Sequence, residues 1–176
     1  HAVLYFNNSW EWSGGYGQYL EWAGNGKALL PSVDGYENYV DHVSRFVKDE
    51  KAKELYYNHV RNIVTRTNTV TGKPYTEDPT IFSWQIGNEP RAFARDSVTK
   101  AAFADWMCTS ASLIKSLDPN HMVSSGSEGL YGCEVDMELF EQIHAHKDFD
   151  YLNVHIWPLV WRWVTKDTFA DSVCVA

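Results

Sequence analysis

One carboxylic acid in this sequence has the setting of a group that moves protons. Glu89 lies in the run Asn88-Glu89-Pro90-Arg91, directly after the apolar stretch 80–86, which predicts a buried strand. At the end of such a strand, loss of water can raise the pKa of a carboxyl group, which suits a proton donor that later acts as a base. Asn88 offers a donor and an acceptor to ligand hydroxyls. The residues alone leave a second interpretation open, in which Glu89 caps a loop or pairs with Arg91.

The elements that position Glu89 alternate along the chain. Apolar runs predict strands at 2–6, 80–86, 121–125 and 151–156, and helical spacing predicts helices within 35–68, 98–117 and 137–146. The first strand is predicted to be buried on both faces. The stretch 10–35 is rich in glycine and aromatic residues and predicts a long functional loop. Together the order indicates an α/β fold with parallel strands.

Residues able to do chemistry follow each predicted strand: Asn7-Asn8, Asn88-Glu89, Glu128 and His155. This clustering is typical of the TIM (β/α)8 barrel, whose sites are built at the C-terminal ends of its strands. A doubly wound nucleotide-binding sheet would carry GxGxxG after a strand, and the sequence has none. Four strands already occupy 176 residues, whereas a whole barrel typically needs about 250. We therefore expect 1–164 to be the central part of one catalytic barrel completed by further polypeptide, and 165–176 to be a tail without a clear strand.

Composition narrows the class of partner. The formal net charge of −8 argues against nucleic acid, because phosphate binding relies on clustered lysine and arginine. No apolar run reaches the roughly 18 residues that a membrane span needs, and neither a signal peptide nor an initiator methionine is recognisable at His1. Aromatic residues reach 15%, and tryptophans in predicted loops have faces suited to sugar rings. These loop tryptophans are Trp10, Trp12, Trp157, Trp161 and Trp163.

The cysteines carry no recognisable site. Cys108, Cys133 and Cys174 are widely spaced and match neither a zinc pattern nor a CxxC redox pattern. Buried free thiols are therefore expected, and one disulfide in an exported protein stays open as the alternative.

The Asn-Glu-Pro sequence after an apolar strand resembles the clan of retaining (β/α)8 glycoside hydrolases, in which it closes the fourth strand. A longer set of matches narrows the resemblance to the endo-β-1,4-mannanases of glycoside hydrolase family 5. The matching stretches lie in order at 7–15, 75–85, 125–132 and 153–158. The resemblance places them around barrel strands three to six. It implies endo-acting hydrolysis of β-1,4-mannosidic bonds in mannan, glucomannan or galactomannan, with no metal or organic cofactor.

By the same resemblance, Glu89 is the acid/base, and Asn88 hydrogen-bonds the substrate hydroxyl next to the anomeric carbon. The family's nucleophile is a second glutamate after the seventh strand, and its first two strands carry an active-site arginine; both regions are missing from this chain. A retaining mechanism needs two carboxyl groups about 5–5.5 Å apart. The other strand-end carboxylate here, Glu128, is a cleft residue by resemblance. We therefore expect the nucleophile to lie outside this chain.

Five further residues complete the predicted site. The resemblance puts His155 and Trp157 at the cleavage site, where they help orient the nucleophile. It puts Arg91 on the leaving-group side, and Trp10 and Glu128 in the cleft walls. The residues alone favour a core histidine at His155. They also leave open that the two tryptophans are ordinary packing and that Glu128 is a capping or loop carboxylate.

The tryptophan-rich loop departs from the family pattern at Val160 and Arg162, where asparagine and glycine are expected. Two other functions stay open. One is a β-1,4-glucanase or another β-glycosidase of the same clan, and the other is a catalytically incomplete carbohydrate-binding fragment. Because the polymer is extracellular, we expect a secreted, periplasmic or cell-surface protein.

Overall fold

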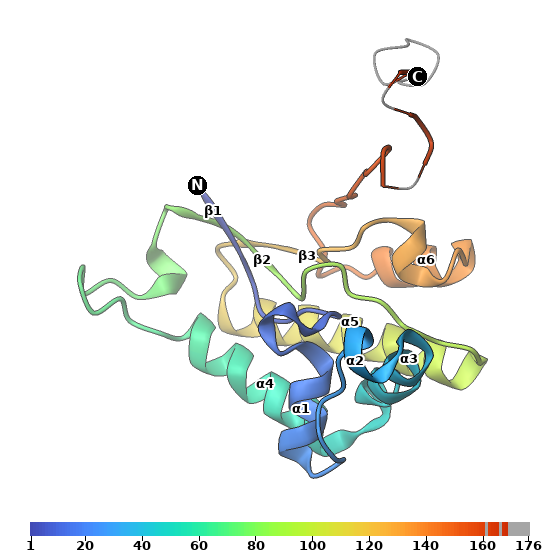
Figure 1. Cartoon of the computed structure of the whole chain (residues 1–176). Coiled ribbons are helices and arrows are strands. Elements are labelled where there is room, and N and C mark those ends of the chain that lie inside the picture. The colour runs from blue at the N-terminus through green and yellow to red at the C-terminus, as the bar shows by residue number, and fades with distance from the viewer. Residues whose placement is uncertain (161, 166, 169–176) are drawn as a thin grey trace.

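The computed structural model describes residues 1–160, 162–165 and 167–168 of the chain. Their centre is a sheet of three parallel strands in the order β1-β2-β3 (Figure 1). The strands are β1 (Ala2–Tyr5), β2 (Ile81–Gln85) and β3 (Met122–Ser124). Leu4 pairs with Trp84, which pairs in turn with Val123, so β2 is the central strand. The α/β fold with a parallel sheet is confirmed.

Helices cover one face of this sheet. The α-helices are α1 (Gly15–Ala23), α2 (Pro31–Asp34), α3 (Tyr36–Val43), α4 (Glu50–Val64), α5 (Ser97–Leu117) and α6 (Met137–His144). Short 3-10 turns lie at Glu11–Ser13, Phe46–Lys48, Tyr75–Glu77 and Leu130–Cys133. Figure 1 shows α1, α4 and α5 side by side below the strands. The predicted helices 98–117 and 137–146 are confirmed as α5 and α6.

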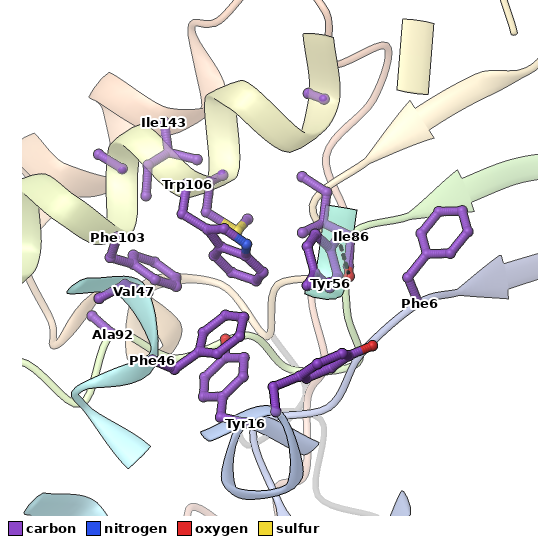
Figure 2. Packing of buried hydrophobic residues seen from close by; sticks show 14 of the residues in the cluster. Phe6, Tyr16, Phe46, Val47, Tyr56, Ile86, Ala92, Phe103, Trp106 and Ile143 are labelled. Atoms are coloured by element: carbon purple, nitrogen blue, oxygen red, sulfur yellow. Dashed lines mark hydrogen bonds between the residues drawn. The ribbon is translucent and has the colours of Figure 1, made fainter. Parts of the chain in front are cut away.

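An aromatic core joins the helices to the sheet. Trp106 of α5 packs edge-on against Phe46 and Tyr56, with ring centroids 5.3 Å from each (Figure 2). Tyr16 of α1 stacks on Phe46 at 4.5 Å. The Tyr56 hydroxyl donates a hydrogen bond of 3.1 Å to the carbonyl oxygen of Ile86. The core therefore fixes the chain at the point where β2 ends.

Between β1 and β2 one prediction is corrected and one is confirmed. The expected loop at 10–35 contains the helix α1. This helix was not predicted because its sequence contains glycine residues. Glycine is a poor helix former, but burial of Tyr16 and Leu20 against the core supplies the stability that local propensity lacks. The helices expected within 35–68 are confirmed as α3 and α4. Asp49 begins α4, because its side chain accepts a hydrogen bond from the Ala52 N–H.

The prediction that the first strand is buried on both faces is wrong. Val3 and Tyr5 of β1 are about half exposed, and so is Phe82 of β2. On β2, Ser83 and Trp84 are both fully buried, although their side chains point to opposite faces of the strand. Leu4 and Trp84 face the helices and the core. On the other face Tyr151 covers Ser83, whereas Val3 and Tyr5 stay uncovered.

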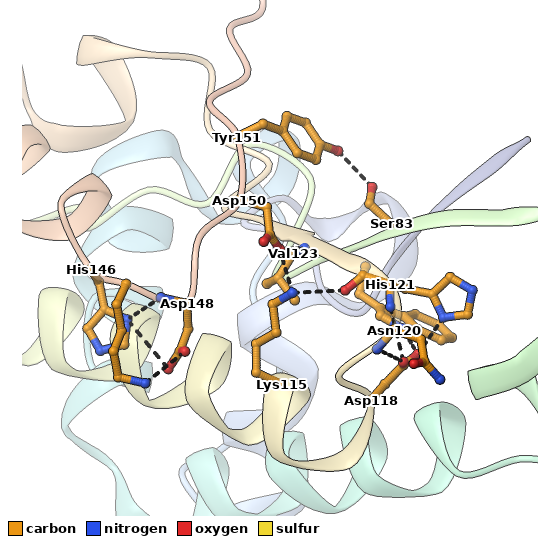
Figure 3. Close-up of polar contacts among 12 residues, drawn as sticks. Ser83, Lys115, Asp118, Asn120, His121, Val123, His146, Asp148, Asp150 and Tyr151 are labelled. Atoms are coloured by element: carbon orange, nitrogen blue, oxygen red, sulfur yellow. Dashed lines mark hydrogen bonds and ion pairs between the residues drawn. The ribbon is translucent and has the colours of Figure 1, made fainter.

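The predicted strand 151–156 is not formed. These residues make no ladder with β3; side chains attach the chain there instead (Figure 3). Asp150 accepts a hydrogen bond of 2.7 Å from the Val123 N–H, and its own N–H donates to the Val123 carbonyl oxygen at 2.9 Å. The hydroxyls of Tyr151 and Ser83 lie 2.7 Å apart. An apolar run predicted a strand here, but the apolar side chains of Leu152, Val154 and Ile156 face solvent.

Several predictions concern the end of the chain. Most of the predicted tail 165–176, with Cys174, lies outside the described residues, as does Trp161. Cys108 and Cys133 are free thiols, the first half-buried and the second buried. Among the residues described, no helix is long and apolar enough to cross a membrane.

Candidate active site

The turn after β2, residues 88–91, is tied to both neighbouring strands; we name it the strand-end turn. The Asn88 N–H donates to the carbonyl oxygen of Asn7 after β1 at 2.8 Å, and the Glu89 N–H donates to that of Gly126 after β3 at 3.0 Å. Glu89 has a φ of +49°, in the left-handed region that side-chain-bearing residues rarely adopt. Strain of this kind persists where the surroundings over-determine the backbone, and it clusters at functional sites.

A buried serine holds the strand-end turn in this shape. The Ser9 hydroxyl donates to the carbonyl oxygen of Glu89 at 2.7 Å and accepts from the N–H of Arg91 at 2.8 Å. Ser9 is fully buried, so without its hydroxyl both backbone groups would lose their partner away from water. Sequence reasoning missed Ser9, since a serine before an aromatic residue gives no signal of a contact made 80 positions away.

The Glu89 carboxylate faces a segment that we name the histidine arm, residues 151–157. His155 Nδ1 lies 2.8 Å from Glu89 Oε1, and Trp157 Nε1 donates to the same oxygen at 3.4 Å. When Glu89 is ionised, the proton must lie on His155 Nδ1 for this bond to form. The Glu89 side chain keeps 16% of its surface exposed. It can therefore reach a ligand while its other oxygen stays uncommitted.

Arg91 pairs with Glu128 rather than with Glu89. Its guanidinium meets the Glu128 carboxylate through Nε to Oε1 and through a second nitrogen to Oε2 at 2.9 Å. Burial opposes the charge on Arg91, but the hydrogen bond and charge of Glu128 outweigh burial and raise the pKa of Arg91. The Glu128 side chain is only 2% exposed. The charge and hydrogen bonds of Arg91 therefore offset the free-energy cost of removing the Glu128 carboxylate from water. The alternative in which Glu89 merely pairs with Arg91 is wrong.

Trp10 lies between the core and the site. Its ring runs parallel to that of Tyr39 at 6.2 Å and edge-on to Phe93 at 5.5 Å. The guanidinium carbon of Arg91 lies 5.3 Å from the ring centroid, within range of a cation–π contact. Among the described residues, Trp10 Nε1 is buried without a hydrogen-bond partner. Trp10 therefore packs against the core through Tyr39 and Phe93, and it also contacts Arg91 of the site.

These groups line one open cleft of about 520 Å³. All seven residues predicted for the site border it: Trp10, Asn88, Glu89, Arg91, Glu128, His155 and Trp157. Trp12 and Val160 complete the lining. Trp12 is 73% exposed, and its ring lies 5.9 Å from that of Trp10. Aromatic faces beside amide and carboxylate groups suit a neutral ligand with apolar C–H faces and many hydroxyls.

The whole chain, residues 1–176, matches the sequence profile of the group described as "GH family 5 beta-mannosidase-like". The chain belongs to glycoside hydrolase family 5. A curated relative, mannan endo-1,4-beta-mannosidase 1 of Arabidopsis thaliana, is 34% identical over 96% of this chain and 42% of its own length. Mannan endo-1,4-beta-mannosidase 4 of Oryza sativa subsp. japonica is 33% identical over 93% of this chain and 35% of its own. The chain therefore spans about two-fifths or less of the length of these relatives.

Solved structures of the family agree in fold. The family 5 mannosidase from Rhizomucor miehei superposes with a TM-score of 0.78 at 35% identity, covering 93% of this chain and 38% of that one. The endo-beta-1,4-mannanase from Thermotoga petrophila gives 0.71 at 28% identity, covering 90% of this chain and 34% of that one. These neighbours are TIM barrels, so the family 5 chain is a parallel α/β portion of that fold.

One departure from the family pattern has a structural consequence. Arg162 adopts a φ of +60°, the left-handed conformation that glycine accepts most easily. Arg162 therefore holds a strained conformation at a position where the resemblance led us to expect glycine. No group of three or more His, Cys, Asp or Glu residues suited to a metal ion occurs in the described ranges.

Proposed function

We propose that the protein hydrolyses internal β-1,4-mannosidic bonds of mannans, with Glu89 as the acid/base. The observation that carries the proposal is the position of Glu89 at the end of the central strand. There its carboxylate borders the aromatic cleft and accepts from His155 and Trp157. Membership of family 5 and the mannan-named relatives support the same chemistry.

The geometry suggests how Glu89 would work. Both bonds from the histidine arm end on Oε1, which leaves Oε2 to carry the proton that is given to the leaving oxygen. After the leaving group departs, the carboxylate can take a proton from a water molecule. The oxygen of that water bonds to the anomeric carbon and displaces the carboxylate of the nucleophile, which frees the glycosyl group. His155 and Trp157 would then stabilise the ionised form that appears between the two steps.

The other cleft residues have proposed binding roles. The Asn88 side chain makes no hydrogen bond to the described residues, so its amide is available to a sugar hydroxyl. Trp10, Trp12 and Trp157 offer aromatic faces for stacking against sugar rings. The paired Arg91 and Glu128 would bind a sugar on the leaving-group side while neutralising each other.

The nucleophile is proposed to come from outside these 176 residues. A retaining mechanism needs a second carboxyl group about 5–5.5 Å from the first. Within the described part of the cleft the other carboxylate is Glu128, which is committed to Arg91. We place residues 1–164 in the centre of the barrel and the histidine arm in the position of the sixth strand. Export is part of the proposal, because mannan is extracellular.

Substrate class is tested by the reducing ends that the full-length protein releases from mannan, glucomannan and galactomannan, with carboxymethyl cellulose as comparison. We expect mannans to be cleaved much faster and the first products to be oligosaccharides of mixed length. Equal rates on both polymers would move the assignment to a broader β-glycosidase. Products released only as single mannose units would favour exo-action, the activity that the name of the Rhizomucor miehei mannosidase suggests.

The role of Glu89 is tested by Glu89→Gln in the full-length protein. Loss of the proton donor should lower kcat by roughly 10²- to 10⁴-fold, the usual contribution of general acid–base catalysis. Calorimetric titration with mannohexaose should still detect binding, because the amide keeps the shape of the side chain. The matched control is Glu138→Gln in the exposed first turn of α6, which should leave the rate unchanged. A Glu89→Gln enzyme with a normal rate would remove Glu89 from the proposed role.

A further inference from the structure

The histidine arm carries the partner of Glu89 but has no main-chain ladder to hold it. Asp150 and Tyr151 attach its beginning to β3 and β2 (Figure 3). Among the described residues, the next attachment is Asn153, and no hydrogen bond to the sheet follows it before His155. The position of the imidazole therefore depends on what Asn153 contacts.

Asn153 makes two hydrogen bonds of opposite direction to the loop after β3. Its Oδ1 accepts from the Gly126 N–H at 3.1 Å, and its Nδ2 donates to the Ser127 carbonyl oxygen at 2.9 Å. A backbone segment would offer the same donor and acceptor, so this one side chain replaces the missing strand pairing. Only a primary amide supplies both functions at this length.

Gly126 connects the main chain of Glu89 with the segment that contacts the Glu89 side chain. Its carbonyl oxygen accepts from the Glu89 N–H, while its own N–H donates to Asn153. Gly126 has a φ of +75°, and a Cβ there would lie 1.8 Å from the Gly87 carbonyl oxygen, so this residue is fixed in place. The contacts close a ring: Glu89 backbone to Gly126, Gly126 to Asn153, Asn153 along the chain to His155, and His155 back to the Glu89 carboxylate.

We propose that Asn153 is a positioning residue that holds His155 against Glu89. It does not border the cleft and acts only through the imidazole. The proposal rests on the proposed function of Glu89. It explains how a largely exposed arm delivers a nitrogen to within 2.8 Å of a carboxylate that belongs to a buried strand end.

The sharpest test is Asn153→Asp in the full-length protein. Aspartate has the same shape and can still accept from the Gly126 N–H. It cannot donate to the Ser127 carbonyl oxygen, and its charge repels that oxygen. A displacement of the order of 1 Å can cost about 100-fold in rate, so we expect kcat on mannohexaose to fall roughly 10- to 100-fold. Asn153→Ala should fall at least as far, whereas Asn153→Gln, which keeps the amide, should recover part of the rate.

A spectroscopic readout separates positioning from loss of folding. Neutral imidazole in water favours the proton on Nε2, whereas a carboxylate acceptor at Nδ1 draws the proton to Nδ1. In ¹⁵N-histidine-labelled protein, with the His155 signals assigned by His155→Gln, we expect the Nδ1–H form in wild type. The Asn153→Asp variant should revert toward Nε2–H, while its thermal midpoint stays within a few degrees of wild type.

The matched control is Asn58→Asp on the exposed face of α4, where a carboxylate can still accept from Arg61. This control should change neither the rate nor the His155 tautomer. Wild-type rate or an unchanged tautomer in Asn153→Asp would overturn the proposal. If wild-type protein does not cleave mannan at all, the proposed function fails, and the tautomer measurement still decides whether Asn153 positions His155.

Discussion

The strand-end turn and the histidine arm meet at one carboxylate, yet they are held by different means. The strand-end turn is fixed by main-chain bonds to both neighbouring strands and by the buried Ser9 hydroxyl. The histidine arm is held by the side chains of Tyr151 and Asn153 and, just before it, by the main chain and side chain of Asp150. The difference shows that a site can combine a rigid reacting group with a partner whose placement rests on a few polar contacts.

Burial follows the same division. Ile86, which leads into the strand-end turn, is fully buried, whereas Ile156 of the histidine arm is 55% exposed. The strand-end turn and the histidine arm therefore contribute differently to the stability of the fold, although both contribute residues to the site. Three experiments test this contrast, beginning with the largest expected effect.

The substitutions Ile86→Ala and Ile156→Ala make the same chemical change beside the strand-end turn and in the histidine arm. In the 176-residue chain, Ile86→Ala should lower the free energy of unfolding by about 2–5 kcal/mol, because it leaves a cavity in the core. Ile156→Ala should stay within about 0.5 kcal/mol, as is usual for a surface change. Urea unfolding followed by tryptophan fluorescence measures both. If the full-length protein shows a cost at Ile156 close to that at Ile86, polypeptide outside these residues covers the histidine arm.

Ser9→Ala tests how the strand-end turn is held. The change leaves the Glu89 carbonyl oxygen and the Arg91 N–H without their buried partner, which should cost about 2 kcal/mol or more in stability. Because Glu89 would also lose support for its left-handed backbone, kcat on mannan should fall with it. The control is Ser116→Ala, whose exposed hydroxyl donates to the Leu113 carbonyl oxygen. Equal behaviour of the two variants would show that the hydroxyl does not fix the turn.

Asp118→Asn tests how β2, the strand that leads into the strand-end turn, is attached to the end of α5. Burial opposes ionisation of Asp118, but hydrogen bonds from Trp84 of β2 and from His121 outweigh it, so the pKa of Asp118 lies below its ordinary value. Figure 3 shows the contact between Asp118 and His121. Such a carboxylate stabilises the fold above its unfolded-state pKa of roughly 4, and this stability is lost as pH falls through the lower folded-state pKa. We expect the variant to be about 1 kcal/mol less stable near neutral pH.

The pH dependence of that difference is the decisive measurement. Other carboxylates also titrate in acid, so wild type and Asp118→Asn are compared by thermal unfolding at each pH. The gap between their midpoints should narrow as the pH drops below about 4. A constant gap from neutral to acidic pH would show that the charge of Asp118 contributes nothing.

The parts of the fold that the sequence predicts are those with a local signal. An apolar run ending at Gly87 marks β2, and helical spacing ending at Asp118-Pro119 marks α5. Glu89 stands at the end of the first of these patterns. The helix α1 escaped detection because packing of Tyr16 and Leu20 stabilises it rather than the propensity of its residues.

The predicted strand 151–156 shows the limit of an apolar pattern. The pattern specifies a tendency to be extended, whereas a ladder also needs a neighbour whose main chain is in register. Ser9 and Asn153 were missed for a related reason. Their partners lie 80 and 26 positions away, so nothing near either residue indicates the contact.

The close approach of residues 87 and 126 also limits how the cleft can be redesigned. Any side chain at position 126 would collide with the Gly87 carbonyl oxygen unless the backbone shifts, so we expect substitutions of Gly126 to distort the turn that positions Glu89. The exposed rim positions Trp12 and Val160 can absorb variation at little cost. A library selected for altered sugar preference should therefore vary Trp12 and Val160 and keep Gly87 and Gly126 unchanged.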